Sequence, residues 1–256
     1  MQLKKNQTES PKCAVGLMSL RMGILVWTIA TLLAGSAHGQ AAANHPDMSG
    51  FWELRFDSFN IPHASLTPQA AAANMADQEE HDRLSIRWCD QLGVPAIMAE
   101  RQPLDIREGP KEMAIVVHPP SSVRYIYTDG RMHPDKDDYD PTTNGHSIGH
   151  WEGDTLVVDT IYFNDRGVTR LPGGGIRTAD SHLTEHFRLL NNGANLLVTF
   201  TWEDAKVFAK PHTYAYMYYK VAAPGMPRIY TCTAGDATRA KFLTTDPQPG
   251  TGWPAN

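Results

Sequence analysis

Residues 146–163 read HSIGHWEGDTLVVDTIYF, and their pattern is the clearest indication of how this chain folds. Apolar and polar residues alternate on both sides of an EGD turn at positions 152–154, which is typical of a β-hairpin. A second hairpin is predicted where residues 182–190 and 195–203 flank the NNG turn at 191–193. Two successive hairpins with short turns indicate an antiparallel, mainly β protein.

The rest of the chain continues this strand pattern with one helical interruption. A helix is predicted over residues 67–85, because Thr67 can cap its start and Pro68 occupies the first helical position. Residues 88–110 are read as irregular. Further strands are predicted at 50–56, 113–118, 122–128, 213–221 and 228–233.

We therefore expect a lipocalin-like antiparallel β-barrel, with a two-sheet sandwich as the alternative. The barrel is favoured because residues 213–221 are apolar on both faces. Strands with that composition fit around an internal apolar cavity beneath a covered outer face.

The first 39 residues are expected to be a cleavable secretory signal. Their apolar run, residues 22–35, is too short to span a bilayer comfortably and follows four Lys or Arg residues. Small residues at Ala37 and Gly39 predict cleavage before Gln40, which leaves residues 40–256 as one exported domain, periplasmic or secreted. A start at Met18 would give a more ordinary signal, and a membrane anchor that is never removed is the alternative.

Charge and cysteine content narrow the class of protein further. Loss of the leader removes four Lys/Arg residues and one Glu, so the formal charge moves from −5 to −8. An acidic chain is a poor candidate for binding nucleic acid or an anionic membrane surface. Cys89 and Cys232 are left, and in an oxidising compartment we expect them to form a disulfide. Two separately buried thiols are the alternative.

Two carboxylates fall on apolar faces of predicted strands. Asp159 shares a face with Val157 and Ile161, and Glu185 shares one with Leu183 and Phe187. Buried carboxylates are costly unless they are paired, and burial usually raises their pKa, so either could serve in acid–base catalysis. Neutralisation by a neighbouring arginine is the structural alternative, and the candidate partners are Arg124 and Arg188.

Histidines supply further candidate groups but no metal motif. His146 and His150 are four residues apart, as are His182 and His186, and on a strand this spacing separates the rings by roughly 13 Å. We therefore predict no metal ligands, although His133, His146 and His182 could meet from different strands.

Two further motifs are read as structural. The acidic run at 135–140 lacks the glycine and final glutamate of a helix-loop-helix calcium site, so a solvated loop is expected. The GHSIG sequence at 145–149 matches a nucleophile elbow. It leads into a hairpin, however, so Ser147 would not have the strand-turn-helix support of such a serine.

Two stretches resemble a family of exported bacterial proteins with the core motif WEGDTLVVDT, here at residues 151–160. They are RYIYTDGRMHP at 124–134 and NGHSIGHWEGDTLVVDTIYFND at 144–165. The resemblance extends over most of residues 88–232 and implies an exported β-barrel. Members of the family usually have Arg at the position of His186 and often Pro-His-Ser at that of residues 176–178. The opening Gly50-Phe51-Trp52 is similar to the first-strand Gly-x-Trp of lipocalins.

These observations predict an enzyme without a cofactor that acts on a small apolar or aromatic molecule by acid–base chemistry, as a lyase, hydratase or isomerase. The predicted catalytic residues are Asp159, Glu185, His146 and His182. Aromatic and basic residues would bind the ligand in the barrel cavity, namely Arg124, Tyr125, Trp151, Arg188 and Tyr216. The alternatives are a lipocalin-like carrier without turnover and a component of a cell-surface assembly.

Overall fold

The structure is a computed structural model, and it describes residues 45–58, 61–73, 75–87, 91–117 and 122–223. The predicted leader, both cysteines of the predicted disulfide (Cys89 and Cys232) and the predicted strand at 228–233 lie outside these residues. Within them, no helix is both long enough and apolar enough to cross a membrane.

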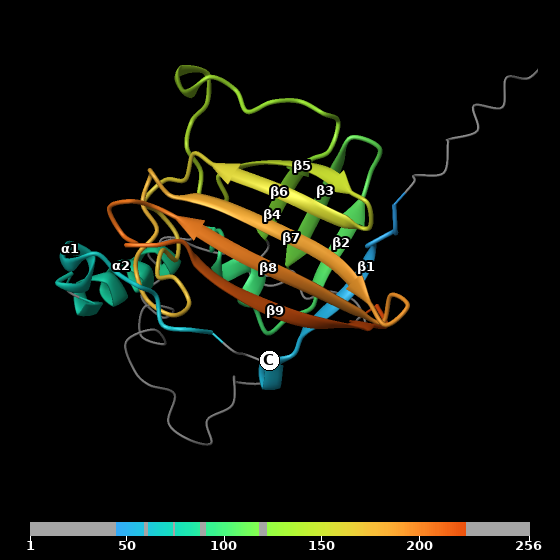
Figure 1. Cartoon of the computed structure of the whole chain (residues 1–256), viewed down its shortest axis with the longest axis horizontal. Coiled ribbons are helices and arrows are strands. Elements are labelled where there is room, and N and C mark those ends of the chain that lie inside the picture. The colour runs from blue at the N-terminus through green and yellow to red at the C-terminus, as the bar shows by residue number, and fades with distance from the viewer. Residues whose placement is uncertain (1–44, 59–60, 74, 88–90, 118–121, 224–256) are drawn as a thin grey trace, which may run out of the picture. The chain divides into compact units, whose positions relative to one another are not determined.

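Nine strands form one closed barrel in which each strand lies beside the next in sequence (Figure 1). The last strand returns to the first, with Phe51 opposite Val221 and Leu54 opposite Tyr218. The predicted mainly β, lipocalin-like barrel is therefore confirmed. The strands are β1 (Gly50–Leu54), β2 (Leu104–Glu108), β3 (Glu112–Val117), β4 (Ser122–Tyr127), β5 (His146–Glu152), β6 (Thr155–Ile161), β7 (His182–Leu190), β8 (Asn195–Glu203) and β9 (His212–Val221).

An odd number of strands prevents the barrel from being antiparallel throughout. Strand direction can alternate around a closed ring only if the number of strands is even, so a ring of nine needs a parallel pair. In this barrel the pair is β4 and β5, with Ile126 opposite Ser147. Parallel neighbours need a long crossover, here residues 128–145, which contain the 3-10 turn η3 (Lys136–Asp138) and arch above β5 and β6 in Figure 1.

Both predicted hairpins are confirmed. Gly153 (φ 64°) lies in the turn between β5 and β6, and Asn191 and Asn192 (φ 53° and 55°) lie in the turn between β7 and β8. The sequence reading missed β2, although its inward-pointing Leu104 and Ile106 alternate with Asp105 and Arg107, because the strand has only five residues and lies in a stretch that was read as irregular.

The predicted first strand and helix are both shorter than expected. Strand β1 ends at Leu54, and Phe56 lies 45% exposed in the 3-10 turn η1 (Phe56–Ser58). The helix is divided into α1 (Pro68–Ala71) and α2 (Met75–Arg87), although Thr67 does cap α1 by accepting a hydrogen bond from the Ala70 amide.

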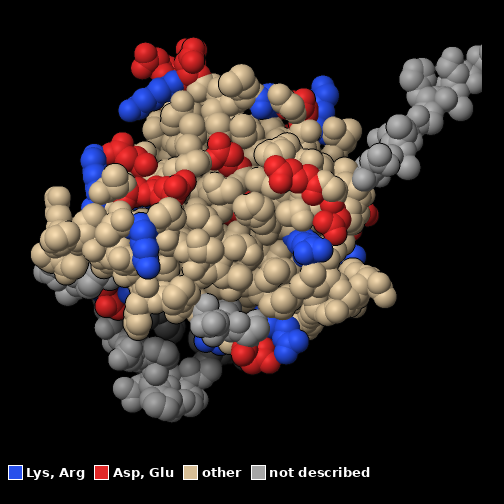
Figure 2. Space-filling view, viewed as in Figure 1, with Lys and Arg blue, Asp and Glu red and all other residues tan. Residues whose placement is uncertain are grey.

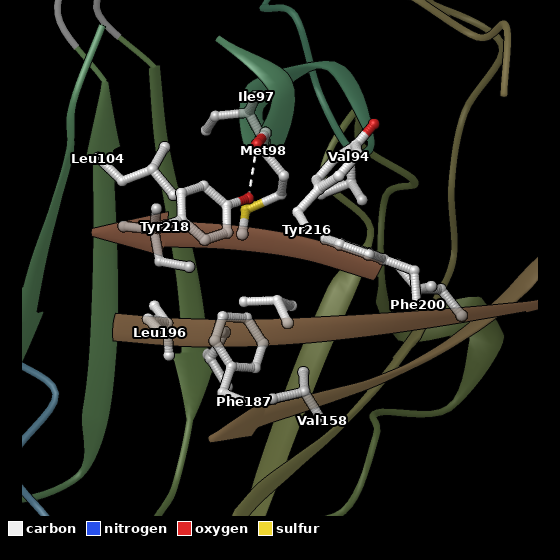
Figure 3. Packing of buried hydrophobic residues seen from close by; sticks show 14 of the residues in the cluster. Val94, Ile97, Met98, Leu104, Val158, Phe187, Leu196, Phe200, Tyr216 and Tyr218 are labelled. Carbon is white, nitrogen blue, oxygen red and sulfur yellow. Dashed lines mark hydrogen bonds between the residues drawn. The ribbon is translucent and has the colours of Figure 1, made fainter. Parts of the chain in front are cut away.

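The barrel interior is packed with aromatic side chains. Trp52, Phe187, Phe200 and Trp202 have no solvent exposure, and the tyrosines of β9 join the same core. A short 3-10 helix, η2 (Ala96–Ala99), contributes to this core, and the Tyr218 hydroxyl donates to the Met98 carbonyl oxygen at 2.6 Å (Figure 3). Tyr216, which was predicted to line a cavity, packs instead against Phe200 at 5.1 Å between ring centroids.

One buried ion pair lies inside the barrel among these apolar groups. Arg124 on β4 donates to both carboxylate oxygens of Glu185 on β7, and neither side chain has any exposure. The same guanidinium also contacts the hydroxyls of Ser147 (3.2 Å) and Thr160 (3.1 Å). The pair joins β4 to β7 across the interior, past β5 and β6. The charge of Glu185 is balanced by Arg124, and its side chain is fully enclosed.

We expect Glu185→Gln to lower the free energy of unfolding by about 3–5 kcal/mol, because it leaves the buried Arg124 charge without a counter-charge. Urea denaturation of the two proteins measures the difference. The double variant Arg124→Met/Glu185→Leu, which removes both charges, should lose much less stability. Arg188→Gln is the surface control, since Arg188 is half exposed and lies 3.6 Å from Asp154. Equal losses in the single and double variants would contradict a stabilising role of charge pairing.

Candidate functional site

A row of titratable side chains crosses the outer face of the barrel beneath the crossover. On β6, the buried residues are Leu156, Val158 and Thr160, so the intervening Asp159 points outward. On β7, Glu185 points inward and His182 outward. Residues 128–145 bring His133 to the same place, and His146 at the start of β5 completes the row. Four residues distant in sequence therefore meet on one outer surface.

The contacts in this row determine which nitrogen atoms carry protons. Asp159 lies between two imidazoles, with its Oδ1 against Nε2 of His182 and its Oδ2 3.3 Å from Nε2 of His133. An ionised carboxylate can only accept, so both Nε2 atoms donate. When the His133 imidazole carries only the proton on Nε2, its Nδ1 is an acceptor, and Nδ1 of His146, 2.8 Å away, donates to it. This leaves Nε2 of His146 as an unprotonated acceptor.

Burial and charge give these groups distinct pKa values. Burial, with His133 and Arg131 nearby, lowers the pKa of His146 to about 4. The hydrogen bond to Asp159 raises the pKa of His182. Burial alone would raise the pKa of Asp159, but its hydrogen bonds and attraction to His182 and His133 outweigh this, and the net change is downward. At neutral pH the row therefore holds an ionised Asp159 and a neutral His146.

A cavity of about 190 Å³ lies beside His146, where β4 and β5 separate. The two strands pair only near Ile126 and Tyr127, and upstream of that point the amide of Asn144 bridges the gap by donating to the Val123 carbonyl oxygen at 3.1 Å. The lining residues are Gln91, Val123, Tyr125, Tyr127, Tyr139, Thr142, Asn144, Gly145, His146 and Ser147. The parallel strand pair thus creates both the crossover and the hollow beneath it.

Aromatic rings hold His146 in the cavity wall. Its imidazole stacks on Tyr127 at 5.3 Å and meets the edge of Tyr139 at 5.1 Å between ring centroids. The guanidinium of Arg131 lies 4.0 Å from the centre of the Tyr127 ring and is hydrogen-bonded to both carboxylate oxygens of Asp129. The base is therefore positioned by packing on several sides, and this is the preorganisation that proton transfer requires.

The predicted catalytic residues are divided between the two faces of the sheet. His146, Asp159 and His182 come together outside, whereas Glu185 lies inside with Arg124. The expectation that Asp159 and Glu185 flank one enclosed cavity is therefore wrong. The two residues lie on adjacent strands, but their side chains point to opposite faces of the sheet. The Asp159 side chain is 42% exposed.

The predicted ligand-binding residues do not form one site either. Tyr125 alone lines the outer cavity. Trp151 stacks on His45 at 3.8 Å, and Arg188 lies near Asp154 at the β5–β6 turn. Ser147, as expected, is no exposed nucleophile, since its hydroxyl points into the barrel toward Arg124.

The sequence reading missed Tyr139, Asn144 and Gln91 altogether and offered His133 only as a possible metal ligand. All four lie in or beside irregular segments, where no periodicity predicts which way a side chain points. The proline and acidic residues at 134–140 were the available signal, because they mark a long crossover. Within the described residues, no cluster of three or more His, Cys, Asp or Glu side chains is arranged to hold a metal ion.

Comparison with known proteins adds no assignment: no protein-family model matches the chain, and the search of curated proteins gives no significant match. On the face drawn in Figure 2, acidic and basic side chains of the described residues are interspersed.

The lowered pKa of His146 predicts a loss of stability in mild acid. Between pH 6.5 and about 4 the unfolded chain binds a proton that folded His146 does not, so stability falls as the pH falls, by up to about 3 kcal/mol. His146→Gln should flatten this part of the profile, as measured by urea unfolding at several pH values.

His182 serves as a control because its pKa is shifted in the opposite direction from that of His146. Its pKa is raised, so its contribution to the free energy of unfolding is present at low pH and is lost as the pH rises through the pKa of the folded state. His182→Gln should therefore steepen the acid-side loss. Matching profiles for the two variants would contradict this account of the row.

Proposed function

We propose that this protein is an enzyme that transfers protons on a small apolar or aromatic molecule without an organic cofactor, as a lyase, hydratase or isomerase. The observation that carries the proposal is His146, a buried, neutral imidazole in the wall of a cavity, backed by His133 and Asp159. A base oriented by a second group, which is oriented by a carboxylate, is a recurrent catalytic arrangement.

The row gives a balanced route for the proton. The substrate proton passes to Nε2 of His146, while the proton on Nδ1 of His146 moves to Nδ1 of His133. The positive charge then lies on His133, next to the Asp159 carboxylate. Transfer of the Nε2 proton to a different atom of the substrate completes an isomerisation, and its transfer to a leaving group completes an elimination. In both cases the other proton moves back from Nδ1 of His133 to Nδ1 of His146. In this scheme His146 is the base and Asp159 is a positioning residue.

His182 supports the row by keeping Asp159 ionised. Its Nδ1 lies 3.5 Å from Glu203, which is half exposed on β8. The row thus runs from a solvent-exposed end to a buried end at the cavity. Glu185 takes no part in this scheme, since its charge is matched by Arg124 inside the barrel.

A carrier without turnover is the second candidate, because the cavity has three tyrosine side chains in its wall. In a carrier, the same row would orient the ligand without exchanging its protons. The two candidates differ in one observable property, namely whether carbon-bound protons of the bound molecule exchange with solvent.

The test is incubation of the protein with a panel of aromatic compounds in D₂O, followed by mass spectrometry of the recovered compounds. Once hydroxyl deuterons have been washed out in H₂O, we expect deuterium on carbon or a new product, formed at a rate reduced at least about 100-fold by His146→Gln, since general bases contribute on that scale. Asp159→Asn should also lower the rate. His150→Gln is the matched control, because His150 is exposed on the same strand and its side chain is hydrogen-bonded to Glu152 on the surface.

Binding without deuterium incorporation or product would favour the carrier. Equal rates in wild type and His146→Gln would exclude His146 as the base.

We also propose that the chain is exported and belongs with the proteins that share the WEGDTLVVDT motif. The support is the apolar run at 22–35, the basic residues before it and the small residues Ala37 and Gly39. Expression of the full chain in a bacterium and intact-mass measurement of the periplasmic protein test this proposal.

We expect the mass of a chain that begins at Gln40. It should be lower by the two hydrogens that Cys89 and Cys232 lose when they form a disulfide. A full-length chain in the membrane fraction would contradict cleavage. A mature chain that reacts with a thiol reagent before reduction would contradict the disulfide alone.

A further inference from the structure

We infer that the cavity between β4 and β5 binds a neutral, single-ring hydroxyaromatic molecule whose hydroxyl group donates a hydrogen bond to His146. This inference names a substrate class for the site above and so rests on the proposed function. Three features of the cavity carry it: size, charge and the hydrogen-bonding groups left available.

The size of the cavity fits one ring. Its volume is about 190 Å³, and an engineered protein cavity of about 150 Å³ holds benzene. A ring with one or two small substituents therefore fits it. The half-exposed Tyr125 offers a flat apolar surface at the margin.

The charge of the lining favours a neutral ligand. None of the ten lining residues is Asp, Glu, Lys or Arg. The nearby Arg131 is engaged by both oxygens of Asp129 at 2.8 and 2.7 Å, so it offers little uncompensated charge. A carboxylate in this cavity would lose its hydration without gaining a counter-charge, which is costly.

The available hydrogen-bonding groups favour a ligand with a donor. The Tyr139 hydroxyl donates to the Gly145 carbonyl oxygen at 3.2 Å, and the Asn144 amide donates to that of Val123. In the described part of the chain, Nε2 of His146 has no hydrogen-bond partner, and the contacts of the row make it an acceptor. A ligand hydroxyl supplies the missing donor and directs its proton toward Nε2 of His146.

The test is isothermal titration of the full mature protein with three ligands. 4-Methylphenol has the ring and the donor, 4-methylanisole has the ring without the donor, and 4-hydroxybenzoate adds a negative charge. We expect 4-methylphenol to bind at least about tenfold more tightly than either of the others, as one hydrogen bond allows.

Two variants locate the effect. His146→Phe should bind 4-methylphenol and 4-methylanisole equally, while His150→Gln should behave as wild type. Tyr125→Ala, at a position 49% exposed and so tolerant of change, should weaken both ligands to a similar degree. It therefore reports on the cavity even if His146→Phe does not fold.

The outcomes separate this inference from the proposed function. Equal binding of the phenol and its ether by wild type overturns the hydroxyl preference, and tighter binding of 4-hydroxybenzoate overturns the neutral class. Deuterium exchange on a compound without a hydroxyl, with no binding of 4-methylphenol, overturns the inference while the enzyme proposal stands. The expected preference for 4-methylphenol without any exchange upholds the ligand class and overturns the catalytic proposal.

Discussion

Closure of nine strands into one barrel is the constraint from which the rest of this structure follows. Because direction cannot alternate around an odd ring, β4 and β5 run parallel, and the chain must travel back along the outside before β5 begins. That return path brings His133, Tyr139 and Asn144 to the outer surface. Separation of the two parallel strands then leaves the hollow beside His146. Closure therefore accounts for the position of the candidate site as well as for the core.

The sheet also keeps two sets of charged groups apart. Asp159 and Glu185 lie on neighbouring strands, and yet one faces the outer histidines and the other faces Arg124 in the interior. The inner pair is enclosed by apolar side chains and matched in charge, so it stabilises the closed form and has no route to a ligand. The outer row is partly exposed and asymmetric, with a buried neutral imidazole at one end and an exposed carboxylate at the other. Only the outer set has the chemical properties of a reactive site.

The sequence predicted those parts of the structure that depend on local patterns. The NNG and EGD turns, the strands beside them and the cap at Thr67 follow from short-range backbone preferences, and all are confirmed. Strand β2 was missed because it is short and lies in a stretch read as irregular, although its residues alternate. The break between α1 and α2 was missed although Asn74, a residue type favoured at helix N-termini, was a local signal for it. For the site, alternation correctly predicted that the side chains of Asp159 and Glu185 each point away from those of their immediate neighbours in sequence. It could not predict which of the two faces of the sheet is the interior of the barrel. That choice depends on the register between strands, and the position of His133 depends on a loop with no periodicity.

The crossover stands apart from the barrel in one important respect. Its residues contribute to the cavity wall, but none of them belongs to the hydrophobic core, which is built from the strands, η2 and other loops. Insertions, deletions and substitutions between residues 134 and 145 can therefore reshape the hollow while the scaffold persists. His146, Asp159 and His182, in contrast, are fixed by strand register. In such an arrangement the shape of the hollow can change during evolution while the positions of these three side chains stay the same, so related barrels should differ most in this one segment.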